Sequence, residues 1–486
     1  MGIKTKKQYL ESLRELNPTI YIAGSKLEGH FAESPYFRTN LNLVCLTFDL
    51  ANDPKWEKSF TAWSPLIEDK VSWWTSVPQS TEDLIRVVRN IKAVAGTKFC
   101  VFCMGIALSV IWAITHEIDQ ENNTQYHERV KNFFKHLQKN DLRFCMGIMD
   151  PKGDRGLKPS KQPDLDMHLR VVKKDKQGIV VRGCKSQVSG GPLTHMILVA
   201  PCRAYDADEK DFVVSFAIPT DTKGITYITR PAAGPLEKME YANPVSSEVG
   251  WTEHFAVFED VFVPWKNVFM CGEWEFTERF INYFSAYARL VKGVCCSART
   301  DMLIGAAALV AQCNGIDKAG HVRSKLTDMM TSSLCGYGCA LAAATESKKH
   351  ASGIMIPDIA IANAGLYEGR LKLAQYFGTL MELAGGVITT MPLEADYKNP
   401  ETKGWMDKYL KGKTNMSTEE RFRILNLAQD ICASRFTGYF MSSILCAGGT
   451  PETNRVEVFR NYNLGEKLKV AKSMAKIHGS IFEQDR

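Results

Sequence analysis

The chain has 486 residues, of which 45% are apolar and 23% are charged, and its formal net charge is +6 at pH 7. This length allows two or three domains with substantial cores, and the balance is typical of a soluble globular protein. Because the positive charge is spread along the chain, it argues against a dedicated nucleic-acid surface and would suit an anionic small substrate.

The 14 cysteines are scattered, and several lie in apolar stretches with a helical pattern. The chain opens with MGIKTKK and continues in polar sequence, without the apolar run of a secretory signal. We therefore expect reduced thiols in a cytoplasmic protein and no disulfide framework.

Residues up to about 146 have the pattern of helices. Residues 80–95, STEDLIRVVRNIKAVA, begin with capping hydroxyls and acidic residues, and residues 126–141, YHERVKNFFKHLQKND, continue the pattern. The uncharged run 99–115, FCVFCMGIALSVIWAIT, is at the short limit of the roughly 17–25 residues that span a membrane. Charged residues close it abruptly, so we predict a buried core helix and no membrane contact.

From about residue 147 to 270 the pattern changes to short strands separated by Gly, Pro and Asp. Residues 168–186, HLRVVKKDKQGIVVRGCKS, predict two strands joined by a turn at Lys176-Gln177-Gly178. From about residue 275 the helical pattern returns, as in GLYEGRLKLAQYFGTLMELAGG, 365–386. These helices have faces too apolar for one chain, which predicts an oligomer.

The sequence therefore predicts an α+β protein of three domains. A helical domain covers 1–146, a β domain covers 147–275, and a helical bundle that mediates oligomerisation covers 276–486.

The segment 150–167, DPKGDRGLKPSKQPDLDM, joins the first two domains. Its prolines fix the backbone, Gly153 and Gly156 allow close approach, and backbone N–H groups could face a flavin or a phosphate. The alternative is a solvated interdomain linker. Positive charge beside a phosphate would come from Lys152, Arg155, Lys158 and Lys161.

Several segments resemble the 4-hydroxyphenylacetate 3-hydroxylase / 4-hydroxybutyryl-CoA dehydratase family in order and spacing, and most closely its dehydratase branch, also called vinylacetyl-CoA Δ-isomerase. They are HEIDQ (116–120) with YHERV (126–130), the segment 150–167, GIVVRGCKSQ (178–187), VFEDVFVPWKNVFM (257–270), MLIGAAAL (302–309) and ELAGGVITTMP (382–392). The resemblance covers nearly the whole chain. It implies an acyl-CoA dehydrogenase-like fold and a homotetramer built as a pair of dimers.

The resemblance also implies an FAD site. The residues that would line the flavin are Met149, Asp150, Lys152, Gly153, Asp154, Arg155, Ser186, Gln187 and Ser189. A neighbouring subunit would add Glu382, Gly385 and Gly386, and His321 and Lys325 would contact the adenine nucleotide. A helix C-cap is the other interpretation of the Gly pair, and both can hold together.

The dehydratase branch uses a [4Fe–4S] cluster, held by C-x3-C and by a later His and Cys. Here Cys103 and Cys295 match two of these ligands, whereas Phe99 and Ala288 stand at the other two positions. Shifted ligation by Cys100, Cys103 and Cys295, with or without Cys296, would be chemically adequate. The alternative is that these are inert core thiols, and we expect no cluster.

Three residues are candidate acid/base groups by the resemblance. Glu253 matches a family glutamate near the active centre, and burial near a flavin would raise its pKa. Lys292 replaces a tyrosine with a proposed acid/base role. A second family glutamate is matched by Ser443, with Glu452 close by. The alternative for Glu253 is a charged residue at a strand edge.

Three functions follow. The first is an FAD enzyme that deprotonates the α-carbon of a small acyl-CoA, leading to isomerisation, dehydrogenation or dehydration; without a cluster, dehydration is the least expected. The second is a two-component monooxygenase that hydroxylates a phenol with reduced FAD and oxygen. Residues 104–119 lack the arginine that would hold a phenolate. The third is a catalytically degenerate subunit that binds flavin or only a partner. We expect the first.

Overall fold

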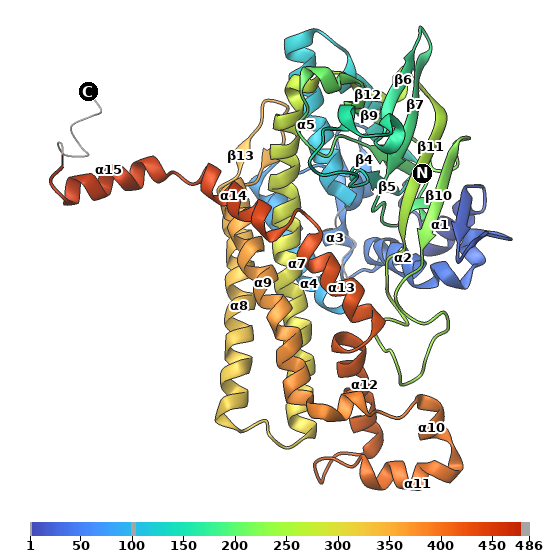
Figure 1. The fold of residues 1–486 in the computed structure, drawn as a ribbon, viewed down its shortest axis with the longest axis vertical. Helices are drawn as coiled ribbons and strands as arrows, with labels where there is room; N and C mark the ends of the chain where they lie inside the picture. Colours follow the sequence, from blue (N-terminus) through green and yellow to red (C-terminus); the bar gives the residue numbers. More distant parts are fainter. Residues whose placement is uncertain (1, 99–103, 478–486) are drawn as a thin grey trace.

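The computed structural model describes residues 2–98 and 104–477. Its β-sheets lie beside one end of a bundle of long helices (Figure 1). The helices that precede the main sheets are α1 (Lys6–Leu13), α2 (Arg38–Asn52), α3 (Glu57–Phe60), α4 (Thr81–Lys98), α5 (Met104–Asn122) and α6 (Tyr126–Lys139).

Helix α4 begins where the sequence predicts a cap. The Ser80 hydroxyl accepts the N–H of Asp83 (3.2 Å), and the Asp83 carboxylate accepts the N–H of Ser80 (3.0 Å). This exchange satisfies backbone donors that the first helical turn leaves open. Helix α5 carries the described part of the predicted apolar helix, and its Ile106, Leu108 and Ile111 are buried as expected.

The sheets hold the middle of the chain. A six-stranded sheet has the order β2-β1-β10-β11-β7-β6, and a four-stranded sheet has the order β12-β9-β8-β5. Phe216 of β9 meets Phe258 of β11 with ring centroids 6.1 Å apart, so the two sheets share a core. The strands are β1 (Thr19–Ile22), β2 (Ser25–Lys26), β5 (Phe144–Gly147), β6 (Arg170–Lys174), β7 (Gly178–Lys185), β8 (Met196–Val199), β9 (Val214–Pro219), β10 (Ile225–Arg230), β11 (Glu253–Pro264) and β12 (Val268–Cys271).

The predicted strand pair at 168–186 is confirmed as β6 and β7. The Asp175 carboxylate accepts the N–H groups of Gln177 (2.8 Å) and Gly178 (3.2 Å), which closes the turn between the two strands. Side chains of β7 alternate between buried and half-buried, as a strand with one face on the core requires.

The expectation that only helices precede residue 147 is wrong. Strand β1 pairs in parallel with β10, from Thr19 against Thr226 to Ile22 against Thr229, so the N-terminal segment completes the larger sheet. A separate hairpin joins β3 (Thr61–Ser64) and β4 (Asp69–Ser72). A four-residue strand is too short for its alternation to stand out, and its partner lies some 200 residues away in the chain.

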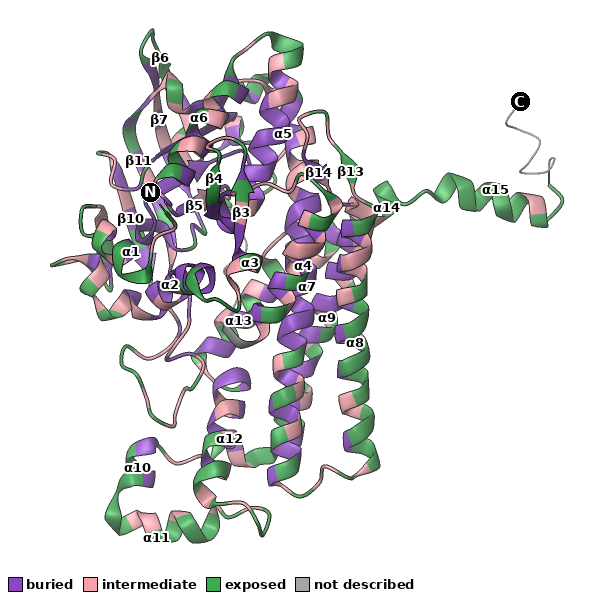
Figure 2. Cartoon of the chain, turned by 180° about the vertical axis from the view of Figure 1, so that it is seen from behind, coloured by how far each residue is buried: buried purple, intermediate pink, exposed green. Residues whose placement is uncertain are grey.

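The bundle consists of α7 (Thr277–Cys313), α8 (Gly320–Thr345) and α9 (Ile359–Ala384), with a small hairpin of β13 (Lys348–Lys349) and β14 (Met355–Ile356) between the last two. Figure 2 shows α7 mostly buried and the outer side of α8 exposed. The helices that follow are α10 (Glu394–Lys398), α11 (Pro400–Tyr409), α12 (Thr418–Cys432), α13 (Arg435–Cys446), α14 (Pro451–Asn461) and α15 (Leu464–Met474).

One described helix, over Trp274–Cys313, is long and apolar enough to cross a membrane by length and composition alone. About two thirds of its most apolar window, 67%, is buried inside the protein. Since α7 packs against α4, α8 and α9, its apolar character is accounted for by the core of the bundle.

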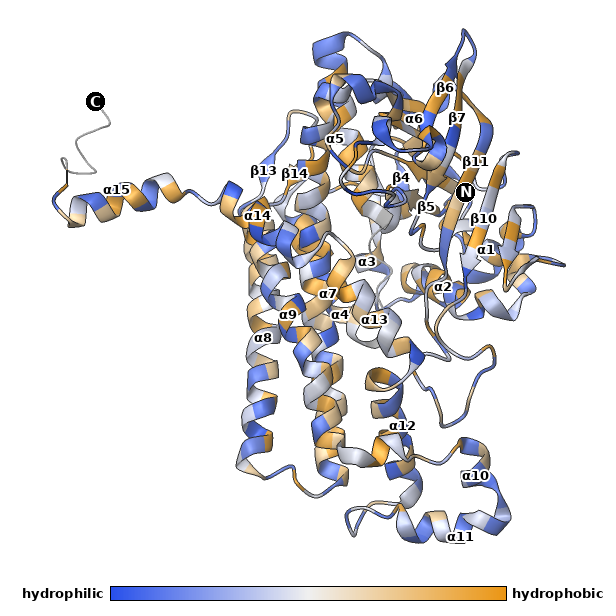
Figure 3. Ribbon diagram, viewed as in Figure 1, coloured by the Kyte–Doolittle hydropathy of each residue, from blue (hydrophilic) through white to orange (hydrophobic). Residues whose placement is uncertain are grey.

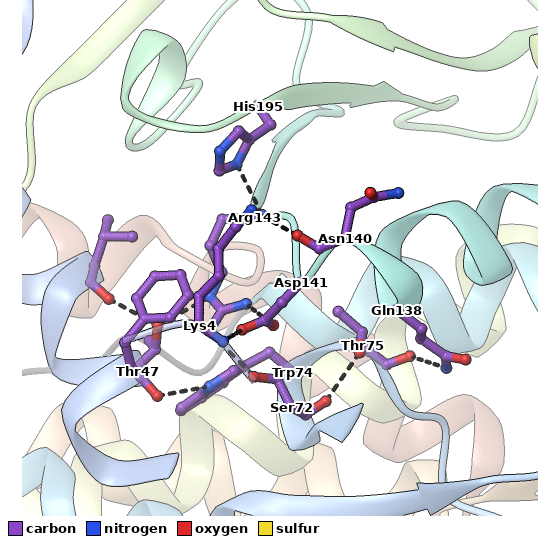
Figure 4. A network of polar contacts seen from close by, with 12 residues as sticks. Lys4, Thr47, Ser72, Trp74, Thr75, Gln138, Asn140, Asp141, Arg143 and His195 are labelled. Atoms are coloured by element: carbon purple, nitrogen blue, oxygen red, sulfur yellow. Dashed lines mark hydrogen bonds and ion pairs between the residues drawn. The ribbon is translucent and has the colours of Figure 1, made fainter. Parts of the chain in front are cut away.

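A buried polar network ties the N-terminal segment to β5 (Figure 4). The Arg143 guanidinium donates to Asp141 (2.8 Å) and Thr47 (2.9 Å), and Asp141 also accepts the N–H of Lys4 (2.8 Å). Burial alone would raise the pKa of Asp141, but the Arg143 charge and the hydrogen bonds from Arg143 and Lys4 together outweigh it and hold that pKa low. The backbone N–H of Arg143 donates to Nδ1 of His195 (3.2 Å), so this imidazole is neutral.

Helix α15 extends away from the body of the protein (Figure 1). Figure 3 shows apolar residues along this arm, and Leu468 and Met474 are 53% and 80% exposed. These apolar side chains are therefore exposed on a helix that projects from the protein.

Candidate functional site

The two segments predicted to line a flavin meet at the ends of β5 and β7. The backbone N–H of Ser186 donates to the carbonyl of Met149 (2.7 Å), and the Ser186 hydroxyl donates to the carbonyl of Asp150 (2.9 Å). Residues 36 and 37 positions apart in the sequence therefore form one surface.

The Asp150 carboxylate binds other residues in the interior of the protein. It forms an almost fully buried ion pair with Lys185 (2.7 Å) and accepts bonds from Cys202 (3.0 Å) and Tyr205 (3.2 Å). Burial would raise the pKa of Asp150, but the Lys185 charge and these bonds outweigh it and hold the pKa low. Asp150 thus stays ionised and fixes the loop, and what it can offer a cofactor is its backbone.

The junction segment is a folded loop and not a loose linker. Gln162 is buried, accepts the N–H of Asp154 (3.1 Å) and donates to its carbonyl (2.8 Å). Gly153 has φ +55°, and a Cβ there would lie 2.5 Å from the Met167 sulfur, so only glycine fits.

The basic residues of this loop differ in whether they are already paired with carboxylates. Lys152 and Arg155 are exposed, and neither has an ion pair within the described residues, so both are available to a pyrophosphate. Lys158, by contrast, pairs with Asp206 (2.5 Å) and Asp208 (3.5 Å). Its expected role beside a phosphate is therefore not supported, because two carboxylates already neutralise it.

The loop after β7 presents two side chains to the exterior. Gln187 has φ +55°, and its side chain and that of Ser189 are exposed, whereas Val188 between them is buried. The N–H of Val188 donates to the carbonyl of His254 (3.1 Å), which aligns the loop with the start of β11. Ser189 is thereby placed against Glu253.

Five polar residues converge there, and we refer to them as the Glu253 cluster: Ser189, Arg230, Glu253, Lys292 and Tyr439. The Ser189 hydroxyl donates to both carboxylate oxygens of Glu253, 2.8 Å from Oε2 and 3.0 Å from Oε1. The Tyr439 hydroxyl donates to Oε1 (2.9 Å). Arg230 is the cross-strand partner of Glu253, and Lys292 reaches the same carboxylate from α7 by its charge.

Opposing influences act on the Glu253 carboxyl. Burial raises its pKa, and the bonds from Ser189 and Tyr439 and the charges of Lys292 and Arg230 lower it by less. The pKa of Glu253 therefore lies above its ordinary value, as expected from the sequence. A half-buried carboxylate of raised pKa is suited to accept a proton from a weak carbon acid.

Tyr439 and Arg230 were not predicted from the sequence. Tyr439 lies on α13, 186 positions after Glu253, in a stretch with no motif, and Arg230 is recognisable only from the pairing of β10 with β11. The Tyr439 contact depends on how α13 packs against the β-sheets, and the Arg230 contact depends on strand pairing.

Glu452 does not join the Glu253 cluster. It lies in the first turn of α14, where its exposed side chain pairs with Arg455 (3.1 Å). Its assignment as an acid/base group gains no support from this position.

The predicted adenine-side residues lie elsewhere. Lys325 of α8 pairs with Glu382 of α9 (2.8 Å), near His321, at the end of the bundle away from the sheets (Figure 1). Gly385 has φ +69°, and its N–H donates to the carbonyl of Glu382, so the C-cap interpretation is confirmed. The contact of these residues and of Gly386 with FAD stays a prediction.

The cluster ligands receive no support within the described residues. Cys100 and Cys103 lie outside them, and Cys295 is buried on α7. Burial raises the pKa of the Cys296 thiol, which opposes the thiolate that a metal requires. In the described part of the chain, the one group of ligand atoms close enough for a metal is Asp206, Asp208 and Glu209, and Lys158 already binds two of these residues.

An apolar pocket lies on another side of α7. Leu290 and Val291, directly before Lys292, form one wall, and Trp74, Leu84 and Ile106 from the N-terminal helices form the other. This pocket could hold a small apolar group close to the helix that carries Lys292.

Comparison with protein families gave two matches that together cover most of the chain. The model described as "4-hydroxyphenylacetate 3-hydroxylase N terminal" matches residues 5–270, and the corresponding C-terminal model matches residues 277–476.

Two curated relatives represent different reactions. The 4-hydroxybutyryl-CoA dehydratase/vinylacetyl-CoA-Δ-isomerase of Clostridium aminobutyricum is 33% identical over 98% of this chain and 100% of its own length. The 4-hydroxyphenylacetate 3-monooxygenase oxygenase component of Thermus thermophilus is 27% identical over 89% of each chain. Both relatives are enzymes.

Solved structures share the fold. An oxygen-tolerant archaeal 4-hydroxybutyryl-CoA dehydratase from N. maritimus superposes with a TM-score of 0.92 at 29% identity, covering 99% of this chain and 96% of its own. A 4-hydroxyphenylacetate 3-monooxygenase oxygenase component, complexed with FAD and 4-hydroxyphenylacetate, gives 0.87 at 24% identity, covering 97% and 98%.

Proposed function

The chain belongs to the 4-hydroxyphenylacetate 3-hydroxylase family, and from this membership we propose that it is an FAD-dependent enzyme acting on a small acyl-CoA thioester. The reaction begins with removal of a proton from the carbon next to the thioester carbonyl. The single observation that carries this proposal is the Glu253 carboxylate, held by two hydroxyl groups and facing Lys292.

The chain's own residues divide the work. Glu253 takes the α-proton, because burial raises its pKa toward that of a base active near neutral pH. The positive charge of Lys292 lies where negative charge develops on the substrate. When bound, FAD would supply an electron acceptor beside the substrate.

The residues present fit the flavin. Backbone of Met149, Asp150 and Ser186 forms a fixed surface, Gly153 permits close approach, and the exposed Gln187 is free to contact a ring. The Ser189 hydroxyl, also predicted to line the flavin, is bonded to Glu253. Lys152 and Arg155 would bind the pyrophosphate. We therefore propose the flavin site at the predicted residues, except that the Asp150 carboxylate binds Lys185 inside the protein and does not contact the cofactor.

Isomerisation or dehydrogenation is favoured over dehydration. Elimination of water from an unactivated position needs a Lewis acid, and Ala288 on α7 offers no ligand atom for one. The dehydratase relative is matched over its full length at 33% identity, which supports an acyl-CoA substrate.

The second candidate is hydroxylation of a phenol, which the monooxygenase relative at 27% identity keeps open. Helix α5 contains no arginine over its described length, Met104–Asn122, so the expected phenolate partner is missing from it. The third candidate is a catalytically degenerate subunit, because several positions differ from the catalytic residues of the family.

We also propose a cytoplasmic homotetramer. Its support is the separation of Lys325 and Glu382 from Ser186 within one chain, together with the exposed apolar arm of α15. A second copy would bring the adenine-side residues to the flavin.

Two assays on FAD-loaded protein separate the candidates. Vinylacetyl-CoA should be converted to an isomer, as followed by liquid chromatography and absorbance. Addition of NADH, a flavin reductase, oxygen and a phenol should yield no catechol. Catechol formation without acyl-CoA turnover would establish the second candidate, and inactivity in both assays would favour the third.

A further inference from the structure

The two oxygens of Glu253 have different surroundings. Oε1 accepts a bond from Tyr439 (2.9 Å) and a longer one from Ser189 (3.0 Å), whereas Oε2 accepts from Ser189 alone, at 2.8 Å, among the described residues. A proton added to the carboxylate therefore meets two distinct environments.

Tyr439 can act only as a donor to Glu253. Burial and the neighbouring carboxylate raise the pKa of its phenol well above the ordinary value, so it stays protonated. The Arg230 guanidinium lies over its ring, 5.0 Å from the centroid. Its helix is fixed at the start by Ser434, whose hydroxyl accepts the N–H of Phe436 (3.1 Å). The ring is therefore covered on one face by Arg230, on a helix whose start is capped.

Ser189 differs from Tyr439 because its side chain is exposed and its hydroxyl can rotate. Its side chain faces the exterior, and a serine hydroxyl can turn to donate or to accept. It is thus able to follow a change in protonation at Oε2 and to exchange a proton with water.

We propose that Tyr439 is a positioning residue that occupies Oε1 and reserves Oε2 of Glu253 for the transferred proton, and that Ser189 passes this proton to solvent. The inference rests on the proposed function. The substrate C–H bond breaks, its electron pair stays on the substrate, and an O–H bond forms at Oε2. Ser189 then accepts that proton while its own hydroxyl proton goes to water, which restores the carboxylate.

Other charged groups face this site. Arg230 comes from β10, Lys292 comes from α7, and Arg299 of α7 acts on Tyr439 by its charge. Tyr439→Phe leaves all three residues in place, so a change in the titration of Glu253 in that variant reflects the lost hydrogen bond.

The test uses Tyr439→Phe and Ser189→Ala in the full-length, FAD-loaded protein. Infrared titration follows the carboxyl band that Glu253→Gln removes, and this readout needs no turnover. Tyr439→Phe should shift the titration to higher pH and lower the maximal rate about tenfold, because a hydrogen bond to a charged group is lost. Tyr376→Phe is the matched control, since its hydroxyl donates to the carbonyl of Asp328 (3.0 Å), away from Glu253.

Ser189→Ala is tested with α-deuterated vinylacetyl-CoA. Wild-type protein should release most of the deuterium to water, and the variant should retain several-fold more of it in the product. Unchanged retention would overturn the role of Ser189, and an unchanged infrared titration in Tyr439→Phe would overturn that of Tyr439. If the wild type does not turn over the thioester, the proposed function fails, and the infrared titration still decides whether Tyr439 holds Glu253.

Discussion

Glu253 occupies the first position of β11, where the chain returns from a long loop to the sheet beside Arg230. Its neighbours come from the loop after β7, from strand β10 and from helices α7 and α13. The pKa of Glu253 therefore depends on how these elements pack together. The candidate could be named from the sequence because it matches a family glutamate. Its hydrogen-bond partners could not, since Tyr439 has no local pattern that distinguishes it from a packing residue.

Two buried histidines make stability depend on pH. Burial lowers the pKa of His195 and that of His254 to about 3, against an ordinary value of 6.5. The unfolded chain therefore binds more protons between pH 6.5 and 3, and stability is lost as the pH falls through this window. At pH 5.5 the loss is about 1.4 kcal/mol for each histidine.

Urea unfolding at pH 7.5 and pH 5.5 measures this loss. His195→Gln should reduce the difference, because an amide can accept from Arg143 and donate to Ser12, as the imidazole does, without titrating. Equal stability of the wild type at the two pH values would contradict the assignment of neutral buried imidazoles.

At the scale of elements, alternation and capping signals predicted β6, β7 and α4, because each of these is determined by residues within its own span. Strand β1 escaped prediction since its four residues become a strand only by pairing with β10. Composition alone could not decide whether the junction loop, residues 150–167, is a solvated linker or part of a ligand site. What decides its conformation is a single buried glutamine, Gln162, and composition cannot reveal burial.

The junction loop gives a prediction at this scale. Gly153→Ala should weaken FAD binding by about tenfold or more, because a Cβ would clash with Met167 and Gln162 at a backbone conformation that favours glycine. Fluorescence titration with FAD measures the dissociation constant. Gly353→Ala is the matched control, since this glycine also has a positive φ, +90°, and a Cβ there meets nothing within 4 Å. Equal affinity in both variants would show that the loop does not contact the flavin.

On the scale of the whole molecule, α7 connects the parts. It carries Lys292 toward the Glu253 cluster, packs against α8 and α9, and leaves the predicted adenine-side residues at the far end of the bundle. The apolar faces of the bundle helices predict an oligomer, and this stays a prediction. The arm formed by α15 could not, because its sequence is that of any short amphipathic helix.

Removal of this arm should disturb assembly. A chain ending at Asn461, and a milder variant with Leu468→Asp and Met474→Asp, should sediment as a smaller species than the wild type in analytical ultracentrifugation. Both variants remove exposed apolar side chains that a second copy would cover in the assembly. Lys469→Asp, which changes charge on the same helix without removing an apolar group, should assemble normally. Unchanged sedimentation of the truncated chain would exclude the arm from the subunit interface.

The most direct measurement is α-proton exchange between vinylacetyl-CoA and deuterated water, catalysed by the FAD-loaded protein. Glu253→Gln should lower the exchange rate by a hundredfold or more, roughly the contribution of a positioned general base, while FAD remains bound. Glu259→Gln, an exposed glutamate on the same strand, should exchange at the wild-type rate. Exchange at the wild-type rate in Glu253→Gln would contradict the assignment of this carboxylate as the base.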